Sequence, residues 1–330
     1  MFIRAFKTNY IYLPILMIVV TFLLWLNGFL FYSEISIPTE NQAPLYSFIA
    51  PFLERYKFIN VLLAFVLLIL QAFMLNNVIT LKNFIDRYSY MPGFLYAVLM
   101  SSSFEMLSLH PVLISNFFLI IVLNKIVDVY HDDRVYLEIF NVGFLIGIAS
   151  LFYFPSILFV LLAIIALFIY FLVSLRSIIA TGLGVFTPFF FLGMYYFMVD
   201  KLEKKFNEFI GLYEPFNIFS IELGTYFEYY VIFLSFLAFV ALIKVYFVVV
   251  LDNPIRIRKR YNVLLFYLIV SLTSLLFITQ KNMVYHGVLM VPLSAILACF
   301  FHSNKKNFWN ELFFTILIIS LVLMKIQRFI

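Results

Sequence analysis

The chain has 330 residues, of which 65% are hydrophobic and only 12% are charged, and its formal net charge is +5. A water-soluble domain carries about twice that charged fraction, so the composition excludes an ordinary soluble protein and favours one that lies in a bilayer. The single cysteine, Cys299, excludes an internal disulfide and any cysteine-rich metal site.

Apolar runs close to the length of a transmembrane helix, about 20 residues, follow one another along the whole chain. We expect an all-α, polytopic membrane protein with about eleven transmembrane helices, folded as a single integral membrane domain over residues 1–330. The third, fourth and fifth runs are short, which leaves tilted, broken or re-entrant helices open. The expected crossings are 11–32, 58–81, 93–109, 112–129, 138–153, 156–174, 177–199, 226–251, 262–279, 284–301 and 308–327.

Two loops on one side of the membrane are longer than the others. In the loop 33–57, residues 44–54 place their apolar side chains on one helical face, as a helix lying in the membrane interface would. The loop 200–225 alternates charged residues with aromatic ones and predicts a second interfacial helix. Neither loop is long enough to form a separate domain.

The placement of Lys and Arg predicts the orientation of the chain. With the N-terminus in the cytoplasm, thirteen of these residues fall in cytoplasmic loops and eight fall outside. The strongest signal is DNPIRIRKRYN, residues 252–262, which holds four basic residues in a short loop. This distribution explains the positive charge without nucleic-acid binding.

The sequence contains no phosphate-binding glycine loop, no HExxH and no nucleophile elbow. The remaining candidates for chemistry are polar residues at membrane depth, which are energetically expensive and often functional. The stretch SSSFEMLSLHP, residues 101–111, places Glu105 about one turn inside the outer boundary and His110 in the following turn. A carboxylate at that depth favours a cationic or hydrogen-bonding partner.

Two further outer loops supply such partners. The turn TQKNMVYHG, residues 279–287, brings Lys281 and His286 to the same side, and the first long loop adds Glu34 and Glu40. Two interpretations stay open, a shared extracytoplasmic site or a set of separately hydrated loop residues. We predict that Glu105 points into a cavity shared with Lys281 or His286. HDDR, residues 131–134, is too compressed for a metal site, so we expect neither a metal nor another cofactor.

Three stretches resemble an uncharacterised family of polytopic inner-membrane proteins of Bacteroidota. They are APLYSFIAPFLERYKFINVLLAF (43–65), MPGFLYAVLMSSSFEMLSLHPVLISNFFLIIVLNKI (91–126) and YHGVLMVPLSAILACFF (285–301). The resemblance implies a location in the bacterial inner membrane. More distantly, the layout is similar to GT-C glycosyltransferases. The shared features are an interfacial helix in the first outside loop, a Pro44-to-Tyr46 step, and a late helix that opens with a polar residue, His286, before a proline, Pro292.

The GT-C resemblance implies a polyprenyl-phosphate-linked sugar as substrate at the outer leaflet. It implies an acidic catalytic residue in the first outside loop, Glu34 or Glu40. Glu105, singled out by its depth in the membrane, is a further catalytic candidate. Lys281, His286 and His110 would then stabilise the leaving phosphate. The chain departs from GT-C enzymes because it lacks their paired acidic motif and a large outside domain.

Two alternatives to an enzyme stay open. One is a non-catalytic subunit or scaffold of an envelope or secretion assembly, whose partners are other envelope membrane proteins. The other is a lipid or solute transporter, for which TGLGVFTP, residues 181–188, is the candidate broken helix. Membrane lipids surround the protein under all three readings.

Overall fold

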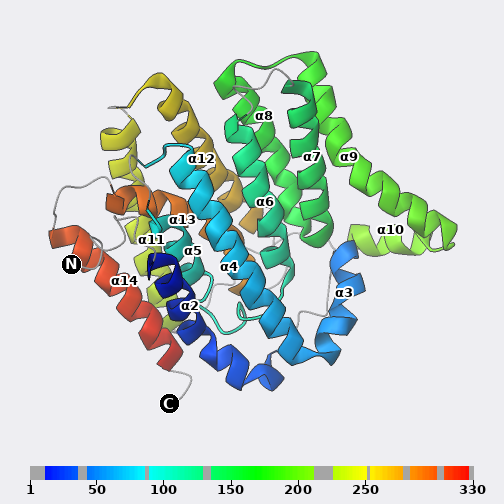
Figure 1. The fold of residues 1–330 in the computed structure, drawn as a ribbon. Coiled ribbons are helices and arrows are strands. Elements are labelled where there is room, and N and C mark those ends of the chain that lie inside the picture. The colour runs from blue at the N-terminus through cyan, green and yellow to red at the C-terminus, as the bar shows by residue number, and fades with distance from the viewer. Residues whose placement is uncertain are drawn as a thin grey trace.

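The computed structural model describes residues 12–35, 43–85, 89–128, 135–211, 226–250, 253–277, 283–302 and 308–326. Every regular element within these ranges is a helix, and they contain no strand (Figure 1). The helices are α2 (Tyr12–Leu30), α3 (Pro44–Arg55), α4 (Lys57–Leu81), α5 (Met91–Leu99), α6 (Pro111–Asp128), α7 (Val135–Phe152), α8 (Phe159–Tyr170), α9 (Leu175–Met198), α10 (Leu202–Gly211), α11 (Tyr226–Lys244), α12 (Ile255–Leu275), α13 (Gly287–His302) and α14 (Phe308–Ile326). Shorter elements are the 3-10 turns η1 (Tyr32–Glu34), η3 (Phe154–Leu158) and η5 (Met283–His286), and the π-helical η4 (Val245–Val250) after α11.

The expected all-α, polytopic architecture is confirmed, and each of the eleven predicted crossings contains a helix. The following are long and apolar enough to span a bilayer: α2, α4, α6, α7, α9 and the helix Val284–His302 that includes α13. Shorter apolar helices cover Phe154–Tyr170, Phe233–Phe247 and Asn310–Ser320. The chain is therefore a membrane protein, and the total of eleven crossings stays a prediction.

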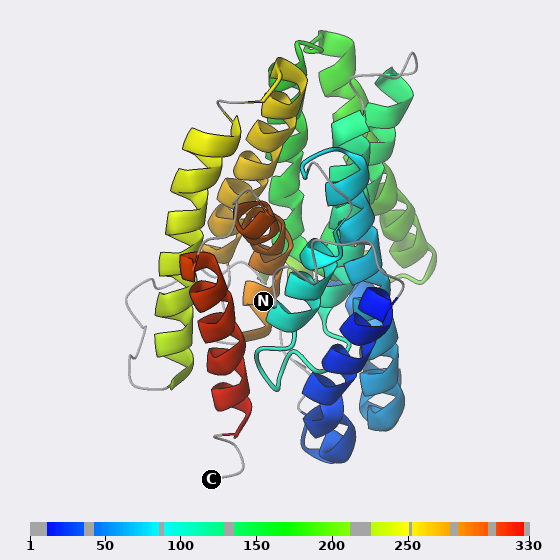
Figure 2. The same cartoon turned by 60° about the vertical axis from the view of Figure 1, so that its left-hand side comes forward.

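Helices α5 and α13 form the centre of the bundle (Figures 1 and 2). All nine residues of α5 and nearly all residues of α13 are buried. The two helices pack against each other, and α4, α6, α11 and α12 pack around them. A helix that is apolar on every face belongs in such an interior position.

The third predicted crossing, 93–109, is a short helix followed by irregular backbone. Pro92 lies in the first turn of α5, and only a glycine fits at position 93, where an added Cβ would lie 2.6 Å from the Ala72 carbonyl oxygen. Helix α5 ends at Leu99, and the Ser101 hydroxyl then bonds back to the Ala97 carbonyl oxygen at 2.6 Å. Residues 100–110 continue without regular structure and are mostly buried. Irregular backbone is tolerated inside a membrane protein when protein surrounds it in this way.

Helices α7 and α9 approach each other closely because glycines line their contact. A Cβ added at Gly143 would lie 2.3 Å from the Thr181 carbonyl oxygen, and one at Gly184 would lie 2.3 Å from the Phe140 carbonyl oxygen. Small residues at such spacing let membrane helices pack backbone to backbone. The stretch 181–188, our candidate for a broken transporter helix, lies within the continuous helix α9, so that expectation is wrong.

Both predicted interfacial stretches contain a helix. Helix α3 covers 44–55, and its Phe48 ring stacks on Tyr196 at the end of α9 with centroids 6.2 Å apart. Helix α10 begins just after the end of α9, and its polar side chains include Glu203, Lys204 and Lys205. Their position in the membrane interface stays a prediction, and residues 36–42 and 212–225 lie outside the described part of the chain.

Candidate functional site

The irregular segment 100–110 is the meeting point of four elements at one end of the bundle, which we call the α3 end. From α3, the Tyr46 hydroxyl donates to the Leu109 carbonyl oxygen at 3.0 Å. From α4, the Asn60 side-chain oxygen accepts from the Leu109 amide at 2.6 Å. The start of α13 also packs here, because a Cβ added at Gly287 would lie 3.4 Å from the Met100 Cε. From α2, the Trp25 indole N–H donates to the Ser101 hydroxyl at 2.9 Å. The segments that carry Glu105, His110 and the start of α13 therefore lie together, whereas the predicted shared site stays a prediction.

Glu105 and His110 both lie in this segment, and each has a buried polar atom. His110 is fully buried, and its Nδ1 accepts from the Leu113 amide at 3.1 Å, which places the ring proton on Nε2. Glu105 is half-buried. Within the described part of the chain, neither His110 Nε2 nor Glu105 Oε2 has a hydrogen-bond partner. The segment thus presents one buried donor and one buried acceptor, and most buried polar groups in native proteins are hydrogen-bonded.

The other predicted site residues are placed differently. Glu34 is exposed on η1, beside Lys57, whose ammonium donates to the Ser33 carbonyl oxygen at 2.7 Å. His286 is half-buried at the end of η5, directly before Gly287. Glu40 and Lys281 lie outside the described residues. The structure therefore gathers the elements that carry Glu105, His110 and His286, whereas Glu34 lies on the exposed turn after α2.

A second cluster of polar side chains links four helices in the interior. The sequence patterns identified only part of this cluster. The Gln71 amide on α4 donates to the Leu113 carbonyl oxygen at 2.7 Å, and the Tyr96 hydroxyl on α5 donates to Gln71 Oε1 at 2.5 Å. The Asn116 amide on α6 donates to the Gly287 carbonyl oxygen at 2.9 Å. All three side chains are fully buried and uncharged. Gln71 could have been found as the one amide in the middle of the apolar run 58–81.

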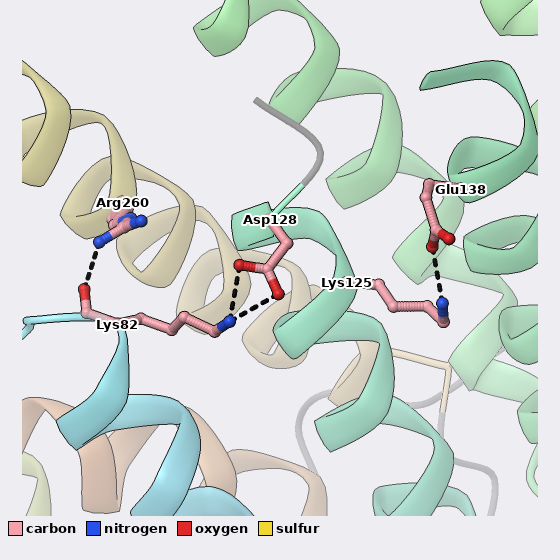
Figure 3. A network of polar contacts seen from close by, with 5 residues as sticks. All are labelled: Lys82, Lys125, Asp128, Glu138 and Arg260. Carbon is pink, nitrogen blue, oxygen red and sulfur yellow. Dashed lines mark hydrogen bonds and ion pairs between the residues drawn. The ribbon is translucent and has the colours of Figure 1, made fainter. Parts of the chain in front are cut away.

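The opposite end of the bundle, which we call the α12 end, is held by ionic contacts (Figure 3). Lys82, just after α4, contacts both carboxylate oxygens of Asp128 at the end of α6, at 2.6 Å each. Lys125 of α6 contacts Glu138 in the first turn of α7 at 2.6 Å. The buried Arg260 of α12 donates to the Lys82 carbonyl oxygen. These contacts tie four helices together at a level where the charged side chains remain partly exposed.

The described residues hold no group of three or more His, Cys, Asp or Glu side chains that could bind a metal ion. The sequence HDDR at 131–134 lies outside the described ranges. The expectation that the protein binds no cofactor stays a prediction from the sequence. What the α3 end does offer is hydrogen bonding: a carboxylate, an imidazole N–H and nearby amide and hydroxyl groups, set in apolar surroundings.

The chain matches no protein-family model, no curated protein and no solved structure in comparisons of its sequence and its fold.

Proposed function

We propose that this protein is a membrane enzyme that acts on a lipid-linked sugar at the α3 end, with Glu105 and His110 in its site. One observation carries the proposal: a buried acceptor, Glu105 Oε2, and a buried donor, His110 Nε2, lie in one irregular segment without partners among the described residues. Native proteins satisfy nearly all buried polar groups. A hydroxyl-bearing substrate would satisfy both atoms.

The GT-C resemblance suggests the substrate, a sugar carried on a polyprenyl phosphate. The acceptor hydroxyl oxygen would attack the anomeric carbon, and the bond from that carbon to the phosphate oxygen would break. Glu105 would take the hydroxyl proton, and the polyprenyl phosphate would leave with the bonding electron pair. The neutral His110 would donate its Nε2 proton in a hydrogen bond to a phosphate or sugar oxygen. Lys281 and His286 are the proposed further phosphate contacts, as the GT-C resemblance implies.

This role requires the α3 end to face the compartment in which the lipid-linked sugar is presented. We therefore propose a location in the bacterial inner membrane, with the N-terminus and the α12 end in the cytoplasm. The basic residues at the start of α12 support this orientation, because Lys and Arg are enriched in cytoplasmic loops. Helix α3, with exposed Phe48 and Phe52, would then lie at the outer leaflet.

The test uses the full chain in lipid nanodiscs loaded with a polyprenyl-phosphate hexose labelled in its sugar. Native mass spectrometry measures whether the donor stays bound, and loss of label from the lipid in membranes measures turnover. We expect Glu105→Gln to keep the donor bound and to lower turnover about 100-fold or more, the usual contribution of a general base. We expect His110→Ala to weaken donor retention.

Glu54→Gln is the matched control, because Glu54 is an exposed carboxylate at the same end. It should leave binding and turnover unchanged. A wild-type protein that retains no polyprenyl-phosphate hexose would overturn the enzyme proposal. Wild-type turnover that survives Glu105→Gln would remove Glu105 from the mechanism. If Glu105→Gln instead lowers protein abundance with no turnover in the wild type, a scaffold role is favoured.

A second candidate, transport of a lipid or solute, is favoured by the interruption of the third crossing. Helix α5 is buried at the centre and gives way to irregular backbone at residue 100, a feature shared by the discontinuous helices of many transporters. If the protein is a transporter, the labelled sugar should appear on the opposite side of a sealed vesicle's membrane while it stays attached to its lipid carrier. The same labelled donor therefore separates the two candidates.

A further inference from the structure

The corner between α8, α9 and α12 concentrates positive charge on the surface of the α12 end. We call Arg176, Arg256, Arg258 and Lys259, together with Phe171, the basic corner. Arg176 lies in the first turn of α9, and the other three cations lie in the first two turns of α12. The tops of α8 and α12 are side by side in both views of the fold (Figures 1 and 2).

The charges of this end do not balance. Around the ends of α4, α6 and α8 and the starts of α7, α9 and α12, the described residues hold seven Lys and Arg but two carboxylates. Those two carboxylates, Asp128 and Glu138, already contact Lys82 and Lys125. The joining loops 86–88, 129–134 and 251–252 add two cations and four carboxylates by sequence, which lowers the excess from five positive charges to three.

The start of α12 raises the local positive potential further. The N-terminus of a helix carries a partial positive charge that repels cations, and no side chain caps α12, whose N-cap residue is Pro254. Burial and the neighbouring Arg256 both lower the pKa of Arg260 from its usual value. Arg260 itself is bound to the Lys82 carbonyl oxygen, so its role is structural. An anion near Arg256 and Arg258 would relieve this repulsion.

Exposed apolar side chains flank the same cations. Phe171 is 85% exposed, Leu175 is 75% exposed and Ile255 is 72% exposed. Phe171 adopts a left-handed backbone conformation (φ 60°), which is unfavourable for a bulky residue, and the Lys259 ammonium lies 4.7 Å from the centre of its ring. Cations next to largely exposed apolar groups are typical of a surface at the boundary between headgroups and acyl chains.

We propose that the basic corner binds the phosphate of an anionic phospholipid in the leaflet that borders the α12 end. The Arg256 and Arg258 side chains and the Lys259 ammonium contact the headgroup, and Phe171, Leu175 and Ile255 contact its glycerol and acyl region. The combination selects a lipid over a free anion, because a free phosphate leaves the three apolar side chains uncovered. This inference does not depend on the reaction proposed for the α3 end.

The test compares two triple variants of the full chain by native mass spectrometry from micelles doped with phosphatidylglycerol or phosphatidylcholine. One variant is Arg256→Gln/Arg258→Gln/Lys259→Gln. The matched control is Lys201→Gln/Lys204→Gln/Lys205→Gln, which removes three cations at the α3 end. Each cation near an anionic surface contributes roughly fivefold to affinity, so the corner variant should retain phosphatidylglycerol on the order of 100-fold more weakly than the wild type. The control should retain it nearly as well as the wild type.

Further measurements separate a lipid site from general charge attraction. Phe171→Ala keeps every cation and should still weaken retention of phosphatidylglycerol, and it serves as the second variant if the triple variant does not fold. Equal losses in the two triple variants, or equal retention of phosphatidylcholine and phosphatidylglycerol by the wild type, would overturn the proposal. Displacement of phosphatidylglycerol by millimolar inorganic phosphate would show a site for a free anion instead of a lipid.

Discussion

The two ends of the bundle differ in how their polar groups are neutralised. At the α12 end, seven Lys and Arg of the described segments stand against two carboxylates, and both carboxylates are in ion pairs. At the α3 end, segments 30–35, 54–57, 100–110 and 199–211 hold five cations and six carboxylates, and the buried contacts use uncharged groups such as Tyr46 and Asn60. The net charge of the described segments therefore differs between the two ends. In the interior of the bundle, hydrogen bonds between uncharged groups connect the helices.

The difference follows from the cost of burying charge. An unpaired ion in an apolar interior is strongly unfavourable, whereas an amide or hydroxyl is tolerated once it is hydrogen-bonded. Gln71, Tyr96 and Asn116 are fully buried and carry no charge. Lys82 and Asp128 are charged and keep 22% and 49% of their side chains exposed. In this bundle, uncharged polar contacts thus mark the buried interior, and ion pairs mark the partly exposed end.

The largest expected effect is on accessibility, because the two ends should lie on opposite sides of the membrane. In a Cys299→Ala background, we expect a membrane-impermeant maleimide to label Lys204→Cys in intact cells and to label Pro254→Cys only after lysis. Both positions are exposed, and the native cysteine is buried. Labelling of both positions in intact cells would contradict the comparison, and the reverse pattern would invert the proposed orientation.

The next effect is on stability in the interior. We expect Gln71→Leu to lower the free energy of unfolding by about 2 kcal/mol, because it leaves the Leu113 carbonyl oxygen and the Tyr96 hydroxyl without their shared partner. Reversible unfolding in mixed micelles, followed by circular dichroism, measures the change. Thr187→Val is the control, since the exposed Thr187 hydroxyl bonds only within its own helix, to the Leu183 carbonyl oxygen. An effect of Gln71→Leu no larger than that of Thr187→Val would mean that the interior contacts contribute little.

Sequence patterns predicted the helices well because apolar runs carry a strong signal. The predicted helix over 44–54 is α3, and the short crossing 93–109 is a short helix with an irregular continuation. The exact end at Leu99 depends on the hydrogen bond from Ser101 to Ala97 and on the space that Gly93 leaves for α4. The approach of Gly93 to Ala72 of α4 is a contact between two elements, so no single run of sequence contains it.

The site was harder to predict than the helices. Glu105 and His110 stood out because an ionisable residue in an apolar stretch is conspicuous. Tyr96 did not, since a tyrosine in a chain with 22 of them carries no signal until the fold places its hydroxyl beside Gln71. The glycine contact between α7 and α9 was present as GFLIG, residues 143–147, but a stretch considered alone does not identify its partner helix.

The smallest expected effect concerns the ion pair between Lys82 and Asp128. Lys82→Met and Asp128→Asn each remove the pair, and Lys82→Met keeps the backbone carbonyl that accepts from Arg260. Because both side chains are partly exposed, we expect a double-mutant cycle to give a coupling free energy of about 0.2–1 kcal/mol at low salt. The same unfolding measurement should show this coupling approaching zero at about 1 M salt, where the screening length is about 3 Å, while the effect of Gln71→Leu stays constant. A coupling that persists at high salt would place the pair out of contact with water, and the α12 end would then resemble the interior instead of differing from it.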